Sequence, residues 1–365
     1  MGGAGTAARR TTIQGAARAD SLRGLLLTQP CNVRYLTGFT GSGGWLLLRD
    51  EQAVLITDPR YGVQAASQAI GCTVAISERG LVAGLAEHGG LAAGDAVGYE
   101  AHVLTCAVLD ELQETLPRCS WVPQPRRVES LRQIKEPVEI DAIRRALRIA
   151  EISLSEVASE LCAGMTEVEV AAALDYACRR RGAERMAFDT IVAAGPNAAL
   201  PHAQPGPRVL RSGDVVLVDM GCVVEGYCSD ITRCLVLGTE LPAPWAAWHE
   251  AVAAAQAAAL GAIRDGVAGS SIDAVAREAL DERGLGDRFV HGLGHGVGLE
   301  IHEGPCLSSR SEECLASGQV VTVEPGVYLS GHGGIRLEDL VVVTDAGCER
   351  LNELPPDPIW CPPTC

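Results

Sequence analysis

The chain has 365 residues, which is long enough for two domains, and its 47% hydrophobic and 21% charged residues are typical of globular proteins. Its 46 acidic and 30 basic residues give a formal net charge of -16, which would repel phosphates, so we expect no nucleic-acid partner. The first twenty residues hold no signal-peptide core and no later run reaches ~18 consecutive apolar residues, so we expect a cytoplasmic protein without membrane association.

The first part of the chain is interpreted as a leader followed by an α/β domain. Residues 1–20 are rich in Gly and Ala, and we expect them to form a flexible leader. Residues 21–123 alternate short apolar runs, typical of strands, with possible helices such as 61–69 and 103–116. Residues 124–136 interrupt this pattern with Pro, paired Arg and Ser, which indicates a linker.

The second part, residues 137–352, begins with two predicted helices. Pro137 suits the first position of a long amphipathic helix. Thr166 and Glu169 have the spacing of a capping box ahead of an apolar run, which indicates the second helix. Residues 353–365 are rich in Pro and are predicted to be a tail on the surface. The 14 cysteines are scattered without the CxxC pairs of zinc sites, so we expect reduced thiols.

An internal repeat lies in this second part. Residues 212–221 (SGDVVLVDMG) and residues 317–326 (SGQVVTVEPG) both follow the pattern S-G-x-V-V-x-V-acid-x-G. Each segment is followed by a second strand-like run with another acid, in SDITR at 229–233 and in RLEDL at 336–340. Two such hairpins, related by a pseudo-two-fold axis, would bring four carboxylates together in one sheet. These carboxylates belong to Asp219, Asp230, Glu324 and Glu338.

The four acids require compensation for their charge. Asp219 and Glu324 each close a run of apolar residues, so they are expected at the ends of buried strands, where an unpaired carboxylate is costly. Salt bridges to Arg233 and Arg336 are an alternative. Two arginines cannot neutralise four acids, and repulsion among the acids would raise their pKa values. Bound divalent cations are therefore the better explanation.

A glycine-rich segment between the repeats, residues 291–305 (HGLGHGVGLEIHEGP), adds three histidines. An isolated histidine is more often an ordinary hydrogen-bonded residue, but three beside an acid cluster indicate a metal site. Oxygen donors with one imidazole suit Mn²⁺ or related ions, whereas structural zinc prefers thiolates. Carboxylates that bridge two cations ~3.5–4 Å apart create a site for a shared hydroxide, so we predict hydrolysis.

These motifs resemble those of the pita-bread metallopeptidases, the family of aminopeptidase P, prolidase and methionine aminopeptidase. V-D-x-G, S-D-I-T-R, H-G-x-G-H-G-x-G-x-x-x-H-E, V-E-P-G-x-Y and R-x-E-D occur in the family's order within about 137–350. The resemblance implies an α+β fold, in which a pita-bread domain with a pseudo-two-fold repeat follows a smaller α/β creatinase-type domain. Residues 32–41 (NVRYLTGFTG) resemble that first domain, which methionine aminopeptidases lack. Creatinase shares the fold without keeping the metal ligands.

The resemblance also implies five metal ligands, namely Asp219, Asp230, His295, Glu324 and Glu338. They would hold two divalent cations, with Mn²⁺ expected and Co²⁺ or Zn²⁺ as alternatives. By analogy Asp230 and Glu338 bridge the two ions, Asp219 completes one site, and His295 with Glu324 completes the other. Glu324 would also accept the proton of the bridging water.

Other residues are assigned to catalysis and substrate binding by the same resemblance. His291 and His302, with Glu324, are expected to be catalytic, because positioned imidazoles can stabilise a developing oxyanion. For Tyr328 a packing role stays open, while Arg336 could orient Glu338 by charge-assisted hydrogen bonding. The substrate-binding residues implied in this way are His202, His291, His302, Tyr328 and Arg336.

The expected function is hydrolysis of the bond between an N-terminal residue and a following proline, as an Xaa-Pro aminopeptidase or Xaa-Pro dipeptidase. Small peptides with proline in the second position are the expected substrates, and a homodimer is expected by resemblance alone. One alternative is a hydrolase of another small amide, because metal ligands specify hydrolysis but not the leaving group. The other is a binding protein that keeps the fold without catalysis.

Overall fold

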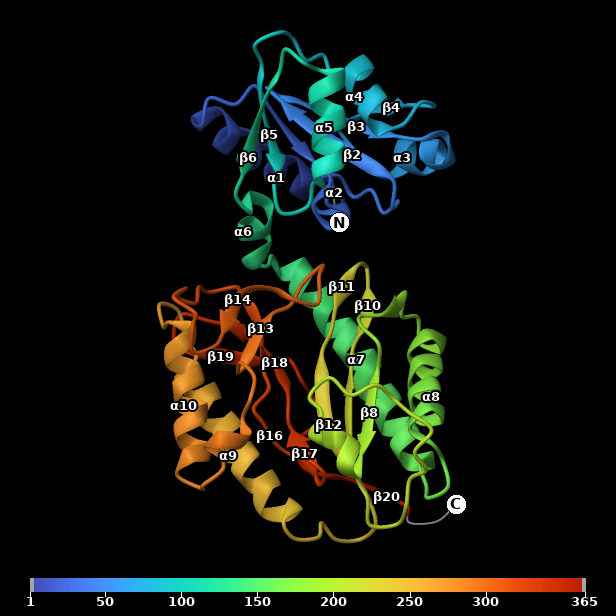
Figure 1. The fold of residues 1–365 in the computed structure, drawn as a ribbon, viewed down its shortest axis with the longest axis vertical. Helices are drawn as coiled ribbons and strands as arrows, with labels where there is room; N and C mark the ends of the chain where they lie inside the picture. Colours follow the sequence, from blue (N-terminus) through green and yellow to red (C-terminus); the bar gives the residue numbers. More distant parts are fainter. Residues whose placement is uncertain (1–2, 363–365) are drawn as a thin grey trace. The chain divides into compact units, whose positions relative to one another are not determined.

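The computed structural model describes residues 3–362, and the chain divides after Arg132 into two compact units (Figure 1). The division lies within residues 124–136, the segment interpreted as a linker. This segment is not extended, because helix α6 occupies Arg127–Gln133.

The first unit is built on a mixed six-stranded sheet with the strand order β4-β3-β2-β1-β5-β6. Its strands are β1 (Gly24–Leu27), β2 (Gly44–Arg49), β3 (Gln52–Thr57), β4 (Thr73–Ile76), β5 (Ala96–Glu100) and β6 (Ser120–Gln124). Its helices are α1 (Gly3–Ala19), α2 (Pro30–Thr37), α3 (Gly62–Gln68), α4 (Leu81–His88) and α5 (Cys106–Thr115). The central strands are apolar at nearly every position because both faces of the sheet are buried. The predicted α/β character of this part is therefore correct.

The flexible leader expected at residues 1–20 is wrong for the described residues, because Gly3–Ala19 form helix α1. Ile13 is buried, and Arg10 Nη1 donates a hydrogen bond to the carbonyl oxygen of Leu36 at 2.7 Å. The alanine content that suggested flexibility instead favours a helix, since alanine has the highest helix propensity. Packing against the rest of the unit then stabilises this helix.

The second unit begins with the two predicted helices, α7 (Pro137–Glu160) and α8 (Glu167–Arg180). Pro137 is the first residue of α7, and Thr166 and Glu169 form the predicted capping box of α8. Helices α9 (Trp245–Ala262) and α10 (Gly269–Asp281) follow later in the chain. In Figure 1, α9 and α10 lie at the left of the strands of this unit and α8 lies at their right, while α7 passes behind the strands β8 and β12. No helix of the described residues combines the length and the hydropathy needed to cross a bilayer.

The strands of the second unit form four sheets, with the orders β20-β12-β9-β8, β14-β13-β15-β18-β19, β11-β10-β7 and β16-β17. The strands before α9 are β7 (Arg185–Met186), β8 (Ile191–Ala194), β9 (Val215–Met220), β10 (Cys222–Val224), β11 (Tyr227–Cys228) and β12 (Ile231–Leu237). Those after α10 begin with β13 (Gly294–Gly296), β14 (Glu303–Leu307), β15 (Val320–Val323) and β16 (Gly326–Leu329). The remaining strands are β17 (Gly333–Arg336), β18 (Asp339–Val343), β19 (Cys348–Arg350) and β20 (Ile359–Cys361).

The internal repeat forms two antiparallel ribbons, β9 with β12 and β15 with β18. They belong to two sheets and not to the single sheet that was expected. The ribbons meet where the Glu338 N–H donates to the carbonyl oxygen of Thr232 at 3.2 Å. Because strands twist, two ribbons that meet at their edges keep only a short hydrogen-bonded contact. The acids of both ribbons nevertheless converge at this contact.

The described part of the C-terminal segment, residues 353–362, lies mostly at the surface, where an edge strand fixes it to the second unit. Strand β20 pairs in parallel with β12. The residues that precede β20 accept hydrogen bonds from the side chain of Arg233. Arg233 Nη2 donates to the carbonyl oxygen of Leu354 at 2.6 Å, and Arg233 Nε donates to that of Pro355 at 2.9 Å. Proline excludes a helix here, but it permits an edge strand. Residues 363–365 of the predicted tail lie outside the described residues.

The thiols of the described residues are reduced with one exception. Twelve of these cysteines are free. Cys162 is disulfide-bonded, so the expectation of reduced thiols is wrong at this position.

Candidate metal centre

A cavity of about 420 Å³ opens in the second unit, where the two ribbons meet. Every site residue predicted from the sequence lines this cavity except Tyr328, which contacts two of the lining residues. The lining residues among them are His202, Asp219, Asp230, His291, His295, His302, Glu324, Arg336 and Glu338. Apolar side chains complete the wall, namely Phe188, Ile191 and Ile301.

Each acid stands at or next to the end of a strand, as the repeat predicted. Asp219 belongs to β9, and Asp230 directly precedes β12. Glu324 directly follows β15, and Glu338 directly precedes β18. His295 lies in the middle of the short strand β13. The antiparallel pairing within each ribbon therefore brings the two acids of one repeat to the same end.

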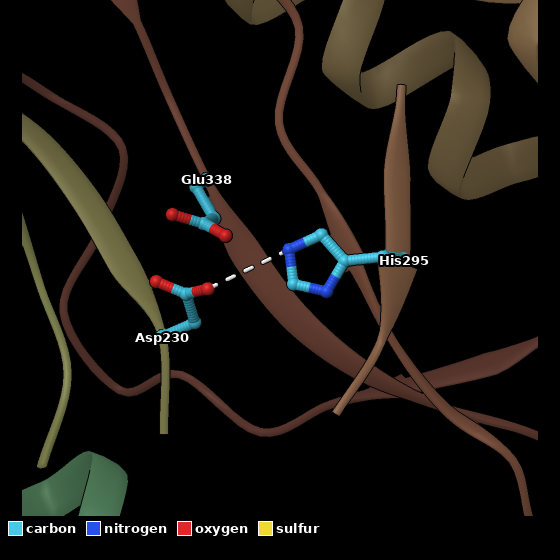
Figure 2. A group of neighbouring side chains, drawn as sticks. All are labelled: Asp230, His295 and Glu338. Carbon is cyan, nitrogen blue, oxygen red and sulfur yellow. Dashed lines mark ion pairs between the residues drawn. The ribbon is translucent and has the colours of Figure 1, made fainter. Parts of the chain in front are cut away.

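The side chains of Asp230, His295 and Glu338 point toward one another from three separate segments (Figure 2). Their ligand atoms all lie within 4.8 Å of one another. His295 Nε2 is 3.7 Å from Asp230 Oδ2 and 3.4 Å from Glu324 Oε1. A single cation could therefore contact atoms from several of these residues after small side-chain movements.

Three buried carboxylate oxygens at this place lack a hydrogen-bond partner in the described part of the chain. They are Asp219 Oδ1, Asp230 Oδ1 and Glu338 Oε1. Buried polar atoms are nearly always satisfied, so these oxygens call for a partner that is not a protein donor. Carboxylates with one imidazole form a donor set that suits divalent cations. The residues present therefore fit a site for a divalent cation.

Burial and mutual repulsion perturb the protonation of these ligands. Burial, together with the neighbouring carboxylates, raises the pKa values of Asp230 and Glu338 well above their usual range. Burial raises the pKa of Glu324 to about 7 and lowers the pKa of His295 to about 4. His295 is thus neutral at pH 7, and neutral imidazole is the form that binds metals.

Arg336 contacts a different acid from the one expected. Its Nη2 donates to Asp219 Oδ2 at 2.5 Å, and its Nε donates to Thr232 Oγ1 at 3.1 Å. Thr232 Oγ1 in turn donates to Glu338 Oε2 at 2.8 Å. Arg336 therefore orients Asp219 directly and Glu338 only through a threonine. Arg233, the other arginine considered as a partner for the acids, instead forms a buried ion pair with Asp339.

His291 is held on both sides of its ring. Its Nδ1 donates to the carbonyl oxygen of Gly292, and its Nε2 lies 2.8 Å from the hydroxyl of Tyr328. Arg336 Nη1 donates a hydrogen bond to the same hydroxyl at 2.9 Å. Because the hydroxyl oxygen accepts from Arg336, the hydroxyl can donate its own proton in a hydrogen bond to His291 Nε2. Burial lowers the pKa of His291 to about 4, which keeps the ring neutral. In this arrangement both ring nitrogens of His291 are engaged by partners within the chain.

His302 keeps its donor free. Neither of its ring nitrogens forms a hydrogen bond within the described residues, and its ring centroid lies 4.3 Å from that of His295. Burial lowers its pKa, as does the nearby His202. A neutral imidazole carries one N–H, which His302 can direct into the cavity.

Two threonines were missed by sequence reasoning. Thr322 Oγ1 accepts a hydrogen bond from the backbone N–H of His295 and donates one to Glu324 Oε1 at 3.1 Å. Thr232 lies directly opposite Asp219 in the β9–β12 pairing. Their signal was the strand period, because residues two apart on a strand face the same side. Thr322 lies two positions before Glu324, and Thr232 lies two positions after Asp230.

A cavity that gathers buried acids and neutral imidazoles defines the class of metal-dependent hydrolases. Residues 141–345 match metallopeptidase family M24, and residues 9–134 match the creatinase/prolidase N-terminal domain. The chain therefore belongs to metallopeptidase family M24. The resemblance to pita-bread metallopeptidases, the two-part fold and the assignment as a metallopeptidase are confirmed.

Relatives match over nearly the whole chain. The peptidase YqhT of Bacillus subtilis is 36% identical over 332 residues, which cover 91% of this chain and 94% of that protein. The structure of an Xaa-Pro dipeptidase from Bacillus anthracis is 35% identical, covers 97% of this chain and 99% of its own, and superposes with a TM-score of 0.92. That of an X-Pro aminopeptidase from Thermotoga maritima is also 35% identical, with coverages of 96% and 99% and a TM-score of 0.90.

Proposed function

We propose that the chain hydrolyses the bond between an N-terminal residue and a following proline in small peptides. The observation that supports this most directly is the cavity, which places the five predicted metal ligands beside neutral histidines and apolar side chains. The Xaa-Pro dipeptidase from Bacillus anthracis and the X-Pro aminopeptidase from Thermotoga maritima, which share the fold, support the substrate class.

Two divalent cations, with Mn²⁺ proposed, would be held by Asp219, Asp230, His295, Glu324 and Glu338. When bound, they supply a Lewis acid for the scissile carbonyl and lower the pKa of a water molecule. Glu324, which lines the cavity beside the other ligands, would accept the proton released by the attacking water. Thr322 fixes the direction of this carboxylate by its hydrogen bond.

The remaining residues bind and orient the peptide. The free N–H of His302 is the proposed donor to the oxyanion, in place of His291, whose nitrogens are both engaged. His291 instead orients Tyr328. His202, which is exposed at the cavity, contacts the bound peptide. The apolar wall provides a surface for the proline ring, since ligand pockets combine apolar area with a few polar groups.

Metal removal and substrate comparison test this proposal together. We expect dialysis against EDTA to abolish hydrolysis of Ala-Pro or Ala-Pro-Ala, and Mn²⁺ to restore it better than Co²⁺ or Zn²⁺. Asp230→Ala should lose both bound metal and activity, whereas Asp141→Asn, on the exposed face of α7, should keep both. Activity that ignores EDTA, or that is equally fast on Ala-Ala, would overturn the proposal. The ratio of the rates on Ala-Pro and Ala-Pro-Ala distinguishes a dipeptidase from an aminopeptidase.

The cytoplasmic location and the homodimer stay predictions. Cell fractionation tests the first, and light scattering coupled to size-exclusion chromatography tests the second. A monomer at micromolar concentration would contradict the expected dimer.

A further inference from the structure

A fully buried carboxylate lies outside the metal centre and has no part in the chemistry above. Glu167, the first residue of α8, has 0% of its surface exposed and does not line the cavity. A buried charge is costly unless hydrogen bonds satisfy it. The partners of this carboxylate therefore indicate what it holds in place.

Both oxygens of Glu167 accept hydrogen bonds from the two ends of one loop, residues 195–205. Oε1 accepts from the Ala194 N–H at 2.8 Å, at the end of β8, and Oε2 accepts from the Gly206 N–H at 3.0 Å. Asn197 Nδ2, within the loop, donates to Oε1 at 3.1 Å and to Oε2 at 3.0 Å. Hydrogen bonds to a charged acceptor are stronger than neutral ones. One carboxylate thus closes this loop at its base.

The loop carries His202 into the cavity. The His202 side chain is exposed, lines the cavity and forms no hydrogen bond within the described residues. Its place is therefore set by the backbone of the loop rather than by contacts of its ring. Next to it, the carbonyl oxygen of Pro201 accepts a hydrogen bond from Arg336 Nη1 at 3.2 Å. The loop is anchored at its base by Glu167 and at its tip by an arginine of the metal centre.

We propose that Glu167 is a positioning residue, which holds residues 195–205 closed and thereby keeps His202 where it contacts the peptide substrate. The inference rests on the proposed function for the role of His202. Glutamine cannot replace Glu167, because its amide NH₂ would face a backbone N–H of Ala194 or Gly206. A displacement of about 1 Å at a substrate contact can lower the rate by roughly 10²-fold, so even partial loosening of the loop is measurable.

The first experiment compares Glu167→Gln with Glu169→Gln. The control residue lies in the same helical turn and caps the helix through Thr166, but it is exposed and does not touch the loop. We expect Glu167→Gln to lower kcat/KM for Ala-Pro about tenfold or more, with unchanged bound Mn²⁺, and Glu169→Gln to change it less than twofold. The Cε1–H NMR signal of His202, identified by its loss in His202→Ala, should shift or broaden only in Glu167→Gln. This second readout does not depend on activity.

A double-mutant cycle with His202→Ala then tests whether Glu167 acts through that histidine. We expect the tenfold effect of Glu167→Gln to fall below twofold in the His202→Ala background, because coupled residues are not additive. Fully additive effects, or an unchanged His202 signal in Glu167→Gln, would overturn the inference. Should Glu167→Gln fail to fold, Asn197→Ala replaces it in the test. This variant removes the side-chain hydrogen bonds between the loop and Glu167, while the two backbone donors still satisfy the buried carboxylate. A wild type that cleaves neither Ala-Pro nor Ala-Pro-Ala would refute the proposed function, whereas the NMR signal would still report on the loop.

Discussion

The crowding of acids at the metal centre predicts that Asp230→Asn affects stability with opposite signs in the absence and presence of metal. Asp230 and Glu338 present ligand atoms within 4.8 Å of one another, and both side chains are buried. At this separation and an effective dielectric constant of about 20, two unit charges repel by about 3.5 kcal/mol. Partial protonation, which their raised pKa values indicate, relieves part of this repulsion. We expect metal-free Asp230→Asn to be about 1–3 kcal/mol more stable than the metal-free wild type.

Bound metal reverses this order. A ligand at 1,000 times its dissociation constant stabilises a protein by about 4 kcal/mol, and Asp230→Asn forfeits most of that gain because it removes a proposed bridging ligand. Each kcal/mol corresponds to about 2–4 °C in Tm for a domain of this size. Thermal unfolding in EDTA should therefore place the variant a few degrees above the wild type, and excess Mn²⁺ should place it below.

The matched control for this experiment is Asp141→Asn, which removes an exposed acid from α7. It should move Tm by no more than the equivalent of about 0.5 kcal/mol in either condition, as surface substitutions do. A variant Asp230→Asn that is less stable than the wild type in EDTA would refute the reasoning. Such a result would mean that these acids do not repel one another in the folded chain.

Three further predictions follow from buried charges in the second unit. The folded chain raises the pKa of Glu324 from 4.5 to about 7 and so keeps a proton that the unfolded chain releases. As pH rises from 4.5 to 7, the free energy of unfolding of the metal-free wild type should therefore fall by about 3 kcal/mol more than that of Glu324→Gln. Equal urea-unfolding profiles of the two proteins over this pH range would contradict this. Lys135 Nζ lies 3.2 Å from Glu303 Oε2, and both side chains are buried. Lys135→Met should therefore lower the free energy of unfolding by about 3–5 kcal/mol, and adding Glu303→Gln should restore part of this loss. Unchanged urea midpoints would exclude a structural role for that pair. Arg336→Lys cannot keep all the contacts of the guanidinium and should weaken metal binding about 10–100-fold in calorimetry, through Asp219; equal affinities would show that Arg336 does not orient this ligand.

Much of the site was predictable because the chain repeats one local pattern. The motif S-G-x-V-V-x-V-acid-x-G specifies a buried strand with an acid at its end, and strand periodicity determines which side that acid faces. Two copies of such a ribbon bring like residues together at their junction. The structure accordingly gathers Asp219, Asp230, Glu324 and Glu338 around one cavity. The capping box of α8 was predictable for the same reason, since Thr166 and Glu169 are only three residues apart.

The sequence was least informative where segments far apart in the chain meet. Residues 1–20 were taken for a flexible leader and residues 353–365 for a surface tail, because the segments that helix α1 and strand β20 contact lie elsewhere in the sequence. Composition describes a segment but does not show whether another segment will cover it. Burial, and not propensity alone, decides whether a short helix or strand persists.

Local pattern, which acts over two to four residues, thus determined the starts of α7 and α8, the two ribbons and the identity of the acids at the metal centre. Only the tertiary structure decided the partners of those acids. Arg336 lies 117 positions from Asp219, and no local periodicity links them. The same holds for Glu167, which contacts a loop about 30 positions away. Nothing in the sequence of its own helical turn shows that this carboxylate is buried rather than an exposed capping residue. Such pairings depend on which surfaces the whole chain brings together, and that is set by the packing of the complete unit.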